Sequence, residues 1–194
     1  PTELLCPETN RDMDATADCL NALGARITRT DTAYSVFPAD VIPQKAALNC
    51  RESGSTLRFM LPVAGALGVD ATFSMEGRLP QRPLSPLWEE MERMGCTLTR
   101  PTKDTVRCRG RLRAGAYSID GSVSSQFITG LLLALSLLNE ESTLSVTGKV
   151  ESKPYIALTA RVLSMFGGDA SHPGGKKLRS PGYIAVEGDW SNGA

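Results

Sequence analysis

The chain has 194 residues, 41% hydrophobic and 22% charged, which is an ordinary globular composition that allows one large domain or two small ones. The chain has 21 lysine and arginine residues and 21 aspartate and glutamate residues, so its formal net charge is zero. No overall electrostatic field therefore favours binding to nucleic acid or to an acidic membrane, and any anion site must be a local arrangement. The five cysteines include no C-x-x-C pair, which argues against a disulfide framework and a zinc site and favours packing thiols in a reducing compartment, the cytoplasm.

Similarity at a fixed spacing of 71 residues divides the chain into repeats. Glycines, small polar clusters and pairs of a basic residue with proline recur at this spacing. The matched pairs are Gly77 with Gly148, Arg82-Pro83 with Lys153-Pro154, residues 53–55 with 124–126, Arg11 with Arg82, and Gly24 with Gly95. These matches predict related units over residues 1–45, 46–113 and 114–189, each reading strand, helix, strand, helix, strand, strand when complete.

The first unit is predicted to be incomplete. Its strand "ELLC" (residues 3–6) corresponds to the second strand of the pattern, and a helix over residues 9–24 follows it. Because the leading strand and helix have no counterpart, we expect the chain to be a piece of a longer protein. Residues 190–194 would then start a crossover to an absent domain.

The middle unit shows the whole pattern. Its first helix is apolar, starts with small polar residues and stops at a glycine, and Pro62 predicts a kink in it. Its second helix is expected to begin at a serine N-cap, Ser85, and to end at Gly95. In chain order the predicted elements are a strand at 46–50, a helix at 53–68, a strand at 70–76, a helix at 85–95, and strands at 96–100 and 105–110.

The third unit repeats the pattern from residue 115 to residue 189. Its first helix includes the longest apolar run, residues 127–138, which is shorter than the roughly 20 residues that a membrane span needs. Since the first helices are apolar nearly all round, they should form the interior. The predicted fold is α/β (α+β), a pseudo-threefold repeat of βαβαββ units in which sheets surround buried helices.

Two polar clusters lie at equivalent strand-to-helix turns, "CRESGSTLRF" (residues 50–59) and "DGSVSSQF" (residues 120–127). Unpaired N–H groups and the helix dipole favour an anion at such turns, and Gly54 would let it approach closely. Serine hydroxyls and the amide of Gln126 add neutral donors. Simple N-capping is the alternative for each cluster alone, whereas two such clusters favour a shared ligand.

A third cluster pairs "QRPL" with "SKPY". Arg82 and Lys153 each precede a proline at the expected start of a second helix, and Tyr155 adds a hydroxyl and a flat face. The alternative is a solvated basic residue beside a helix start. Together the clusters describe an anion-binding surface without a nucleophile, metal ligands or an acid/base pair, so neither a metal nor a cofactor is expected.

Other candidates are assigned structural positions. The single histidine, His172, lies in a Gly/Pro turn and is expected on a surface loop. Asp120 and Asp189 are expected to serve as turn or cap groups. Arg58 is expected to brace the loop rather than to touch a substrate.

The motifs "SGSTLR", "QRP", "GSVSSQF", "SKPY" and "EGDWS" resemble, in this order, those of the 5-enolpyruvylshikimate-3-phosphate (EPSP) synthase family. The resemblance covers essentially the whole chain, and the pair "SSQF" and "SKPY" is its most specific part. It implies that the chain is most of one of two domains, that each domain is built of three such units, and that the active site lies between the two domains. It also implies transfer of the enolpyruvyl group of phosphoenolpyruvate to the 5-hydroxyl of shikimate 3-phosphate, a step of aromatic amino-acid biosynthesis.

The resemblance also implies residue roles. Ser124, Ser125, Gln126, Ser152 and Tyr155 would hold shikimate 3-phosphate. Phosphoenolpyruvate, or the herbicide glyphosate in its place, would contact Gly54, Arg82 and Gln126. The family's acid/base residues belong to the other domain, so this chain alone is expected to have no catalytic residue and no turnover.

One departure from the family concerns Glu52, which stands where the family usually has asparagine. Its carboxylate should repel phosphoenolpyruvate unless it turns away or pairs with Arg51 or Arg58. A different function remains open as well, a phosphate- or RNA-end-binding module of the same repeat. The neutral charge and the 6% aromatic content count against nucleic acid. A purely structural domain is a third alternative.

Overall fold

The structure, a computed structural model, describes residues 1–150 and 152–187. The helices are α1 (Arg11–Ala22), α2 (Gly54–Leu67), α3 (Leu87–Arg93), α4 (Ser125–Leu135), α5 (Lys153–Met165) and the short 3-10 helix η1 (Leu79–Gln81). The strands are β1 (Thr2–Leu5), β2 (Arg26–Arg29), β3 (Ala33–Phe37), β4 (Lys45–Asn49), β5 (Asp70–Ser74), β6 (Cys96–Thr99), β7 (Thr105–Gly110), β8 (Ala116–Asp120), β9 (Thr143–Thr147) and β10 (Tyr183–Ala185). The expected crossover at residues 190–194 and the aspartate at position 189 lie outside the described residues.

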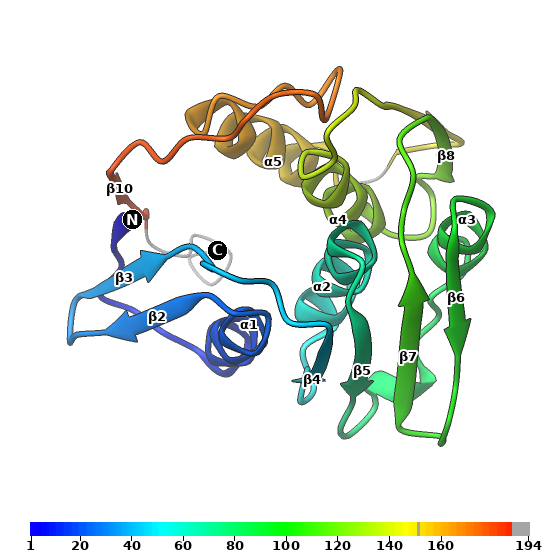
Figure 1. Ribbon diagram of the computed structural model, residues 1–194, viewed down its shortest axis with the longest axis horizontal. Helices are drawn as coiled ribbons and strands as arrows, with labels where there is room; N and C mark the ends of the chain where they lie inside the picture. The colour runs from blue at the N-terminus through cyan, green and yellow to red at the C-terminus, as the bar shows by residue number, and fades with distance from the viewer. Residues whose placement is uncertain (151, 188–194) are drawn as a thin grey trace.

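The predicted α/β arrangement is confirmed. The apolar helices α2 and α4 pack against each other in the interior, with the sheet of the first unit on one side of α2 and that of the second unit on the other (Figure 1). Phe127, Leu131 and Leu135 on α4 are fully buried. Each such side chain contributes about 1.5–3 kcal/mol through burial, which explains why these helices occupy the centre.

The described strands form three sheets. The first has the order β10-β1-β3-β2, the second β4-β5-β7-β6, and the third consists of β8 and β9. In the second and third sheets a unit's first two strands pair in parallel, β4 with β5 and β8 with β9. This pairing reproduces the strand–helix–strand half of the repeat, because a parallel pair requires a crossover helix.

The third unit departs from its predicted pattern. Between α5 and β10 the described chain contains no strand, although two strands were predicted to end the unit. Pro173 and Pro181 cannot donate ladder hydrogen bonds, and the glycines around them leave no alternating apolar pattern. The strand that does form, β10, pairs in parallel with β1 of the first unit. It thereby occupies the place that β4 holds beside β5.

The interior helices approach each other closely at Gly130. A Cβ atom at this position on α4 would overlap the carbonyl oxygen of Arg58 on α2. Glycine therefore permits a backbone-to-backbone contact that any side chain would prevent. α2 itself runs without interruption through Pro62, and the predicted kink there stays a prediction.

The predicted serine N-cap of α3 is wrong. The N-cap residue is Pro86, which has no side-chain acceptor, and Ser85 precedes it. The helix is instead held through Glu90, which is 8% exposed. Its carboxylate accepts hydrogen bonds from the Ser118 amide (2.6 Å) and from Arg93 (2.7 and 2.8 Å). Burial alone would raise the pKa of Glu90, but these bonds lower it below its usual value, so the carboxylate is ionised.

We expect Glu90→Ala to lower the free energy of unfolding by about 1–3 kcal/mol, because it leaves the Ser118 N–H and the Arg93 guanidinium without their acceptor. Urea denaturation followed by circular dichroism measures this loss. The matched control is Glu89→Ala on the exposed side of the same helix, which should stay within about 0.5 kcal/mol of the unchanged chain. Equal effects of the two substitutions would contradict the role assigned to Glu90.

None of the helices in the described residues combines the length and the apolar character that a membrane-spanning segment requires.

Candidate functional site

A cavity of about 740 Å³ lies where the N-terminal ends of α2, α4 and α5 meet. Of the residues predicted for the site, Ser124, Ser125, Gln126, Ser152 and Tyr155 line it, as does Ser55 of the predicted cluster at residues 50–59, whereas Gly54 and Arg82 are not among the lining residues. The other lining residues are Arg58, Phe59, Gly121, Ser122, Val123, Thr129, Leu133, Leu158, Thr159 and Val162. No carboxylate is among these described residues. Three separate segments therefore present hydroxyls, an amide and a guanidinium to one space.

At the tip of α2 the serines have different roles. Ser53 is the N-cap: its Oγ accepts the Thr56 amide (3.2 Å) and lies 2.8 Å from the Thr56 hydroxyl. It is 1% exposed, so the capping interpretation holds for this serine. Ser55, two residues further, lines the cavity, and its hydroxyl lies 3.1 Å from Oγ of Ser53. Of these two serines, only Ser55 is thus in contact with the cavity.

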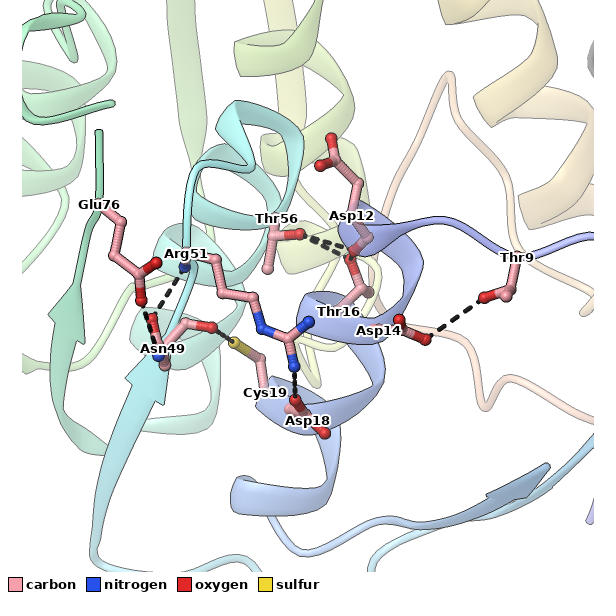
Figure 2. Close-up of polar contacts among 10 residues, drawn as sticks. All are labelled: Thr9, Asp12, Asp14, Thr16, Asp18, Cys19, Asn49, Arg51, Thr56 and Glu76. Atoms are coloured by element: carbon pink, nitrogen blue, oxygen red, sulfur yellow. Dashed lines mark hydrogen bonds and ion pairs between the residues drawn. The ribbon is translucent and has the colours of Figure 1, made fainter. Parts of the chain in front are cut away.

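Helix α1 braces this tip from the outside (Figure 2). The Thr56 hydroxyl donates to the carbonyl oxygen of Asp12 (3.3 Å) and lies 2.7 Å from the hydroxyl of Thr16. Arg51, in the turn before α2, adopts a left-handed conformation (φ 50°) and forms a 2.6 Å ion pair with Asp18. These contacts fix the direction in which the first turn of α2 points.

At the tip of α4, Ser124 is the N-cap and accepts the backbone amide of Gln126 (3.2 Å). The strand before it ends in a tight turn, because the carboxylate of Asp120 accepts the Ser122 amide (2.8 Å), as predicted for a turn group. The side chain of Gln126 then extends toward α2, where it meets Arg58. Ser125 and Gln126 occupy the first turn, whose free N–H groups favour an anion.

At the tip of α5, Ser152 is the N-cap in a left-handed conformation (φ 58°, ψ 39°). Its hydroxyl makes no hydrogen bond within the described part of the chain, so it is available to a ligand. Such a conformation costs about 1–3 kcal/mol for a residue other than glycine and is concentrated at binding sites. Tyr155, one turn later, is 59% exposed and presents its ring to the cavity.

Arg82 lies beside Gly54, the residue before Ser55, but neither Arg82 nor Gly54 is among the described residues that line the cavity. A Cβ atom at Gly54 would lie 3.0 Å from Nη1 of Arg82 and 3.4 Å from Nη1 of Arg58. Within the described residues Arg82 forms no ion pair with a carboxylate. The guanidinium of Arg82 therefore reaches the backbone of Gly54, and its charge suits a small anion at this place.

The prediction that Arg82 stands at the start of a second helix is wrong. Lys153 is the first residue of α5, whereas Arg82 follows η1 and precedes α3 by several residues. The cause is the sequence "PLSP", in which two prolines delay the helix. Neither Arg82 nor Lys153 is among the described residues that line the cavity, and the two differ in their position relative to the helix that follows.

Glu52 turns away from the cavity. Its carboxylate lies against the Cα of Gly77, where a Cβ atom would overlap it. Among the described contacts it pairs with neither Arg51 nor Arg58, which bind Asp18 and Gln126 instead. Two ways to avoid repulsion between the Glu52 carboxylate and phosphoenolpyruvate were expected, turning away or pairing with an arginine. The structure shows the first.

The remaining candidates have the structural positions expected of them. His172 is on an exposed loop, 3.9 Å from Asp169. All five cysteines are buried and unpaired by disulfide bonds. The described residues contain no group of three or more His, Cys, Asp or Glu side chains that could hold a metal ion. The end of the "EGDWS" motif lies outside the described residues.

Sequence reasoning missed a threonine pair in the cavity wall. The hydroxyls of Thr129 on α4 and Thr159 on α5 lie 2.9 Å apart and are both buried. A threonine in the otherwise apolar face of each helix was the available signal. The apolar wall formed by Phe59, Leu133 and Val162 gave no such signal, because these residues also fit the core pattern.

Comparison with known proteins shows which family has this arrangement. The family model described as EPSP synthase (3-phosphoshikimate 1-carboxyvinyltransferase) matches residues 6–194. Curated relatives named 3-phosphoshikimate 1-carboxyvinyltransferase include one from Clostridium kluyveri, 37% identical over 160 residues (81% of this chain, 38% of the relative). A second, from Clostridium beijerinckii, is 34% identical over 202 residues (94% of this chain, 46% of the relative). The chain thus spans less than half the length of these relatives.

Solved structures agree on the fold. The EPSP synthase from Acinetobacter baumannii superimposes with a TM-score of 0.75 at 21% identity, covering 95% of this chain and 44% of that one. The enolpyruvyl transferase NikO from Streptomyces tendae gives a TM-score of 0.61 at 16% identity, covering 95% and 45%. On the family match and the curated relatives, the chain belongs to the EPSP synthase (3-phosphoshikimate 1-carboxyvinyltransferase) family.

Proposed function

We propose that the chain is the shikimate-3-phosphate-binding part of an enzyme that transfers the enolpyruvyl group of phosphoenolpyruvate to the 5-hydroxyl of shikimate 3-phosphate. The observation that carries the proposal is the convergence of three helix tips on one cavity without a lining carboxylate among the described residues. Helix N-termini, hydroxyls and a guanidinium together form a binding site for a phosphorylated, carboxylated ring.

The roles are divided between the cavity and Gly54, which precedes Ser55 of the cavity lining. Ser124, Ser125 and Ser152 offer hydroxyl and backbone donors to the phosphate and hydroxyls of shikimate 3-phosphate, and Tyr155 packs beside its ring. Phosphoenolpyruvate binds beside Gly54, where the guanidinium of Arg82 supplies the charge. Gln126 lies between the two substrates and contacts both.

In the reaction, the 5-hydroxyl of shikimate 3-phosphate gives up its proton to a base and its oxygen bonds to C2 of phosphoenolpyruvate, while C3 gains a proton from an acid. Inorganic phosphate then leaves C2, C3 loses a proton, and the enol ether remains. The residues of this chain hold the two anions in contact and stabilise their charge, which is the positioning and electrostatic share of catalysis. The groups that move protons belong, by family resemblance, to the remainder of the protein.

The partner of this chain is therefore the rest of the same polypeptide in a longer, two-domain cytoplasmic protein. The coverage supports the longer polypeptide, since the chain spans 46% of the Clostridium beijerinckii relative. The division into two domains rests on the family resemblance, and the cytoplasm on the cysteine pattern. The unit boundaries are 1–45, 46–113 and 114–189. No metal or cofactor enters the scheme.

A chimaera tests the proposal. In it, residues 1–194 replace the matching segment of the Clostridium beijerinckii relative, and the isolated 194-residue chain is assayed beside it. We expect the chimaera to release inorganic phosphate from phosphoenolpyruvate when shikimate 3-phosphate is present, and the isolated chain to release none. Turnover by the isolated chain would refute the division of labour. A folded chimaera without activity would refute the proposed reaction.

Gly54→Ala should raise the KM of the chimaera for phosphoenolpyruvate about tenfold, because the new methyl would press on Nη1 of Arg82 and take the place assigned to the anion. The KM for shikimate 3-phosphate should stay unchanged, since Ser124 and Ser152 are not displaced. Folding should not suffer, because the atoms nearest to the methyl are ends of flexible side chains. Steady-state kinetics with each substrate varied in turn measures both constants. An unchanged KM for phosphoenolpyruvate would contradict its placement at Gly54.

A further inference from the structure

Arg58 is a charged residue in the interior of the domain. It is 9% exposed, yet its guanidinium lies between the tips of α2 and α4 and lines the cavity. Its Nη1 donates to Oε1 of Gln126 at 2.6 Å, and its Nη2 donates to the carbonyl oxygen of Pro83 at 3.4 Å. The guanidinium carbon also lies 5.3 Å from the centre of the Phe127 ring. Arg58 thus connects α2, α4 and the loop that carries Arg82.

Stability alone does not account for this residue. Burial lowers the pKa of Arg58, and the charge of Arg82 lowers it further, so both effects oppose the charged form. Its Nε is buried without a hydrogen-bond partner among the described atoms. An unsatisfied buried donor typically costs about 1–3 kcal/mol. An apolar residue would fill the same space at less cost, which indicates that the donors of Arg58 serve another purpose.

The chemistry of the guanidinium determines how Gln126 is oriented. Arginine carries N–H donors and no acceptor, so the carbonyl oxygen of the Gln126 amide must face it. The amide NH₂ then points away from Arg58. Because Gln126 lines the cavity, this orientation offers N–H donors, rather than a carbonyl oxygen, to an anion. A flipped amide would place its oxygen toward the anion and repel it.

We propose that Arg58 is a positioning residue that holds the Gln126 amide with its NH₂ group toward the substrates. The proposal rests on the proposed function for the identity of the anions, but the orientation itself does not depend on them. Arg58 acts through Gln126 and does not itself need to touch a substrate. Its bond to the Pro83 carbonyl keeps the Arg82 loop at a fixed distance from the same amide.

The ligand-free part of the test uses the 194-residue chain and the side-chain NH₂ resonances of Gln126 in ¹⁵N-edited NMR spectra. We expect Arg58→Met, which keeps the volume but removes the donors, to shift and broaden these resonances. Arg58→Lys should restore them in part, because an ammonium group can still donate to the carbonyl. Arg109→Met, on the outer face of β7, is the matched control and should leave them unchanged. Unchanged Gln126 resonances in Arg58→Met would overturn the proposal.

The ligand-dependent part titrates shikimate 3-phosphate into the same chain and into Gln126→Leu and the double variant Arg58→Met/Gln126→Leu. Arg58→Met should weaken binding about tenfold, the loss of one well-placed hydrogen bond to a charged group. In the Gln126→Leu background it should cause no further loss, since the amide through which it acts is gone. An equal loss in both backgrounds would overturn the proposal, because Arg58 would then act on the ligand directly or through the fold.

The two parts separate this inference from the proposed function. In one outcome, the Gln126 resonances shift in Arg58→Met, but the unchanged chain shows no response to shikimate 3-phosphate or phosphoenolpyruvate at millimolar concentration. This outcome would support the proposed orientation of the Gln126 amide and count against the shikimate-3-phosphate site. Urea denaturation of each variant identifies any that fails to fold. If Arg58→Met does not fold, the folded Arg58→Lys variant is compared with the unchanged chain instead. If its Gln126 resonances and its affinity equal those of the unchanged chain, the guanidinium of Arg58 is not required to orient the amide.

Discussion

Gly130→Ala is expected to lower the free energy of unfolding by about 3 kcal/mol, at the upper end of the usual cost of overpacking a core. The added methyl would overlap the carbonyl oxygen of Arg58 on α2. That oxygen belongs to a helical backbone held by its own hydrogen bonds, so it cannot turn aside as a side chain can. The helices must separate instead. For a chain of this size the loss corresponds to a fall in Tm of roughly 6–12 °C, which differential scanning calorimetry measures.

The matched control is Gly65→Ala, also in the interior of a helix. A methyl at Gly65 would lie 2.9 Å from the sulfur of Cys96, 3.2 Å from Leu112 and 3.3 Å from Met91, and all three contacts are side-chain atoms. These can shift by a few tenths of an ångström, and alanine gains about 1 kcal/mol over glycine in a helix. We therefore expect Gly65→Ala to stay within about 1 kcal/mol of the unchanged chain. Similar losses for both variants would show that the backbone contact at Gly130 is not what limits the packing.

The consequence of Gly130→Ala extends to the cavity. Gly130 lies about one helical turn from Gln126, and Arg58 provides both the carbonyl that contacts Gly130 and the guanidinium that binds Gln126. Separation of α2 and α4 would stretch the 2.6 Å bond between these side chains. The same glycine therefore sets the packing of the interior and the spacing of two of the three helix tips.

Much of the fold was predictable from local sequence signals. The small polar starts of α2 and α4 and the glycine after α2 determined those helices, since each supplies a cap that the helix backbone requires. The repeat then predicted that equivalent tips lie close together, because each apolar helix must enter the same core. Ser55, Ser124, Gln126, Ser152 and Tyr155 indeed line one cavity.

Other features depended on contacts that no local signal reports. The pairing of Glu3 with Tyr183 joins opposite ends of the chain, and the weak apolar pattern around β10 does not identify its partner. Ser53 and Ser55 are the same residue type two positions apart. Only the path of the turn decides which one caps the helix and which lines the cavity. Arg58 was expected to brace a loop. Its hydrogen bond to Gln126, 68 residues away, required the packing of α2 on α4.

Arg82→Met is expected to have the largest effect on activity, a fall of about 100- to 1,000-fold in kcat/KM for phosphoenolpyruvate in the chimaera, similar to the loss of one preorganised donor from a charge-stabilising site. In the described residues no carboxylate neutralises Arg82, and its Nη1 lies 3.0 Å from the position that a Cβ of Gly54 would take. Removing it therefore removes charge from the place assigned to the anion. Phosphate release measured over a range of phosphoenolpyruvate concentrations gives the ratio.

Two further variants separate the charge of Arg82 from its shape. Arg82→Lys should recover part of the loss, because an ammonium group restores the charge without the two-pronged contact that a guanidinium makes with a carboxylate or phosphate. Arg78→Met removes an exposed arginine four residues earlier, just before η1, and should leave kcat/KM unchanged. If Arg78→Met and Arg82→Met reduced activity equally, the effect would come from the overall positive charge of this segment. The anion would then not be held at Gly54, and the assignment of phosphoenolpyruvate to that space would be wrong.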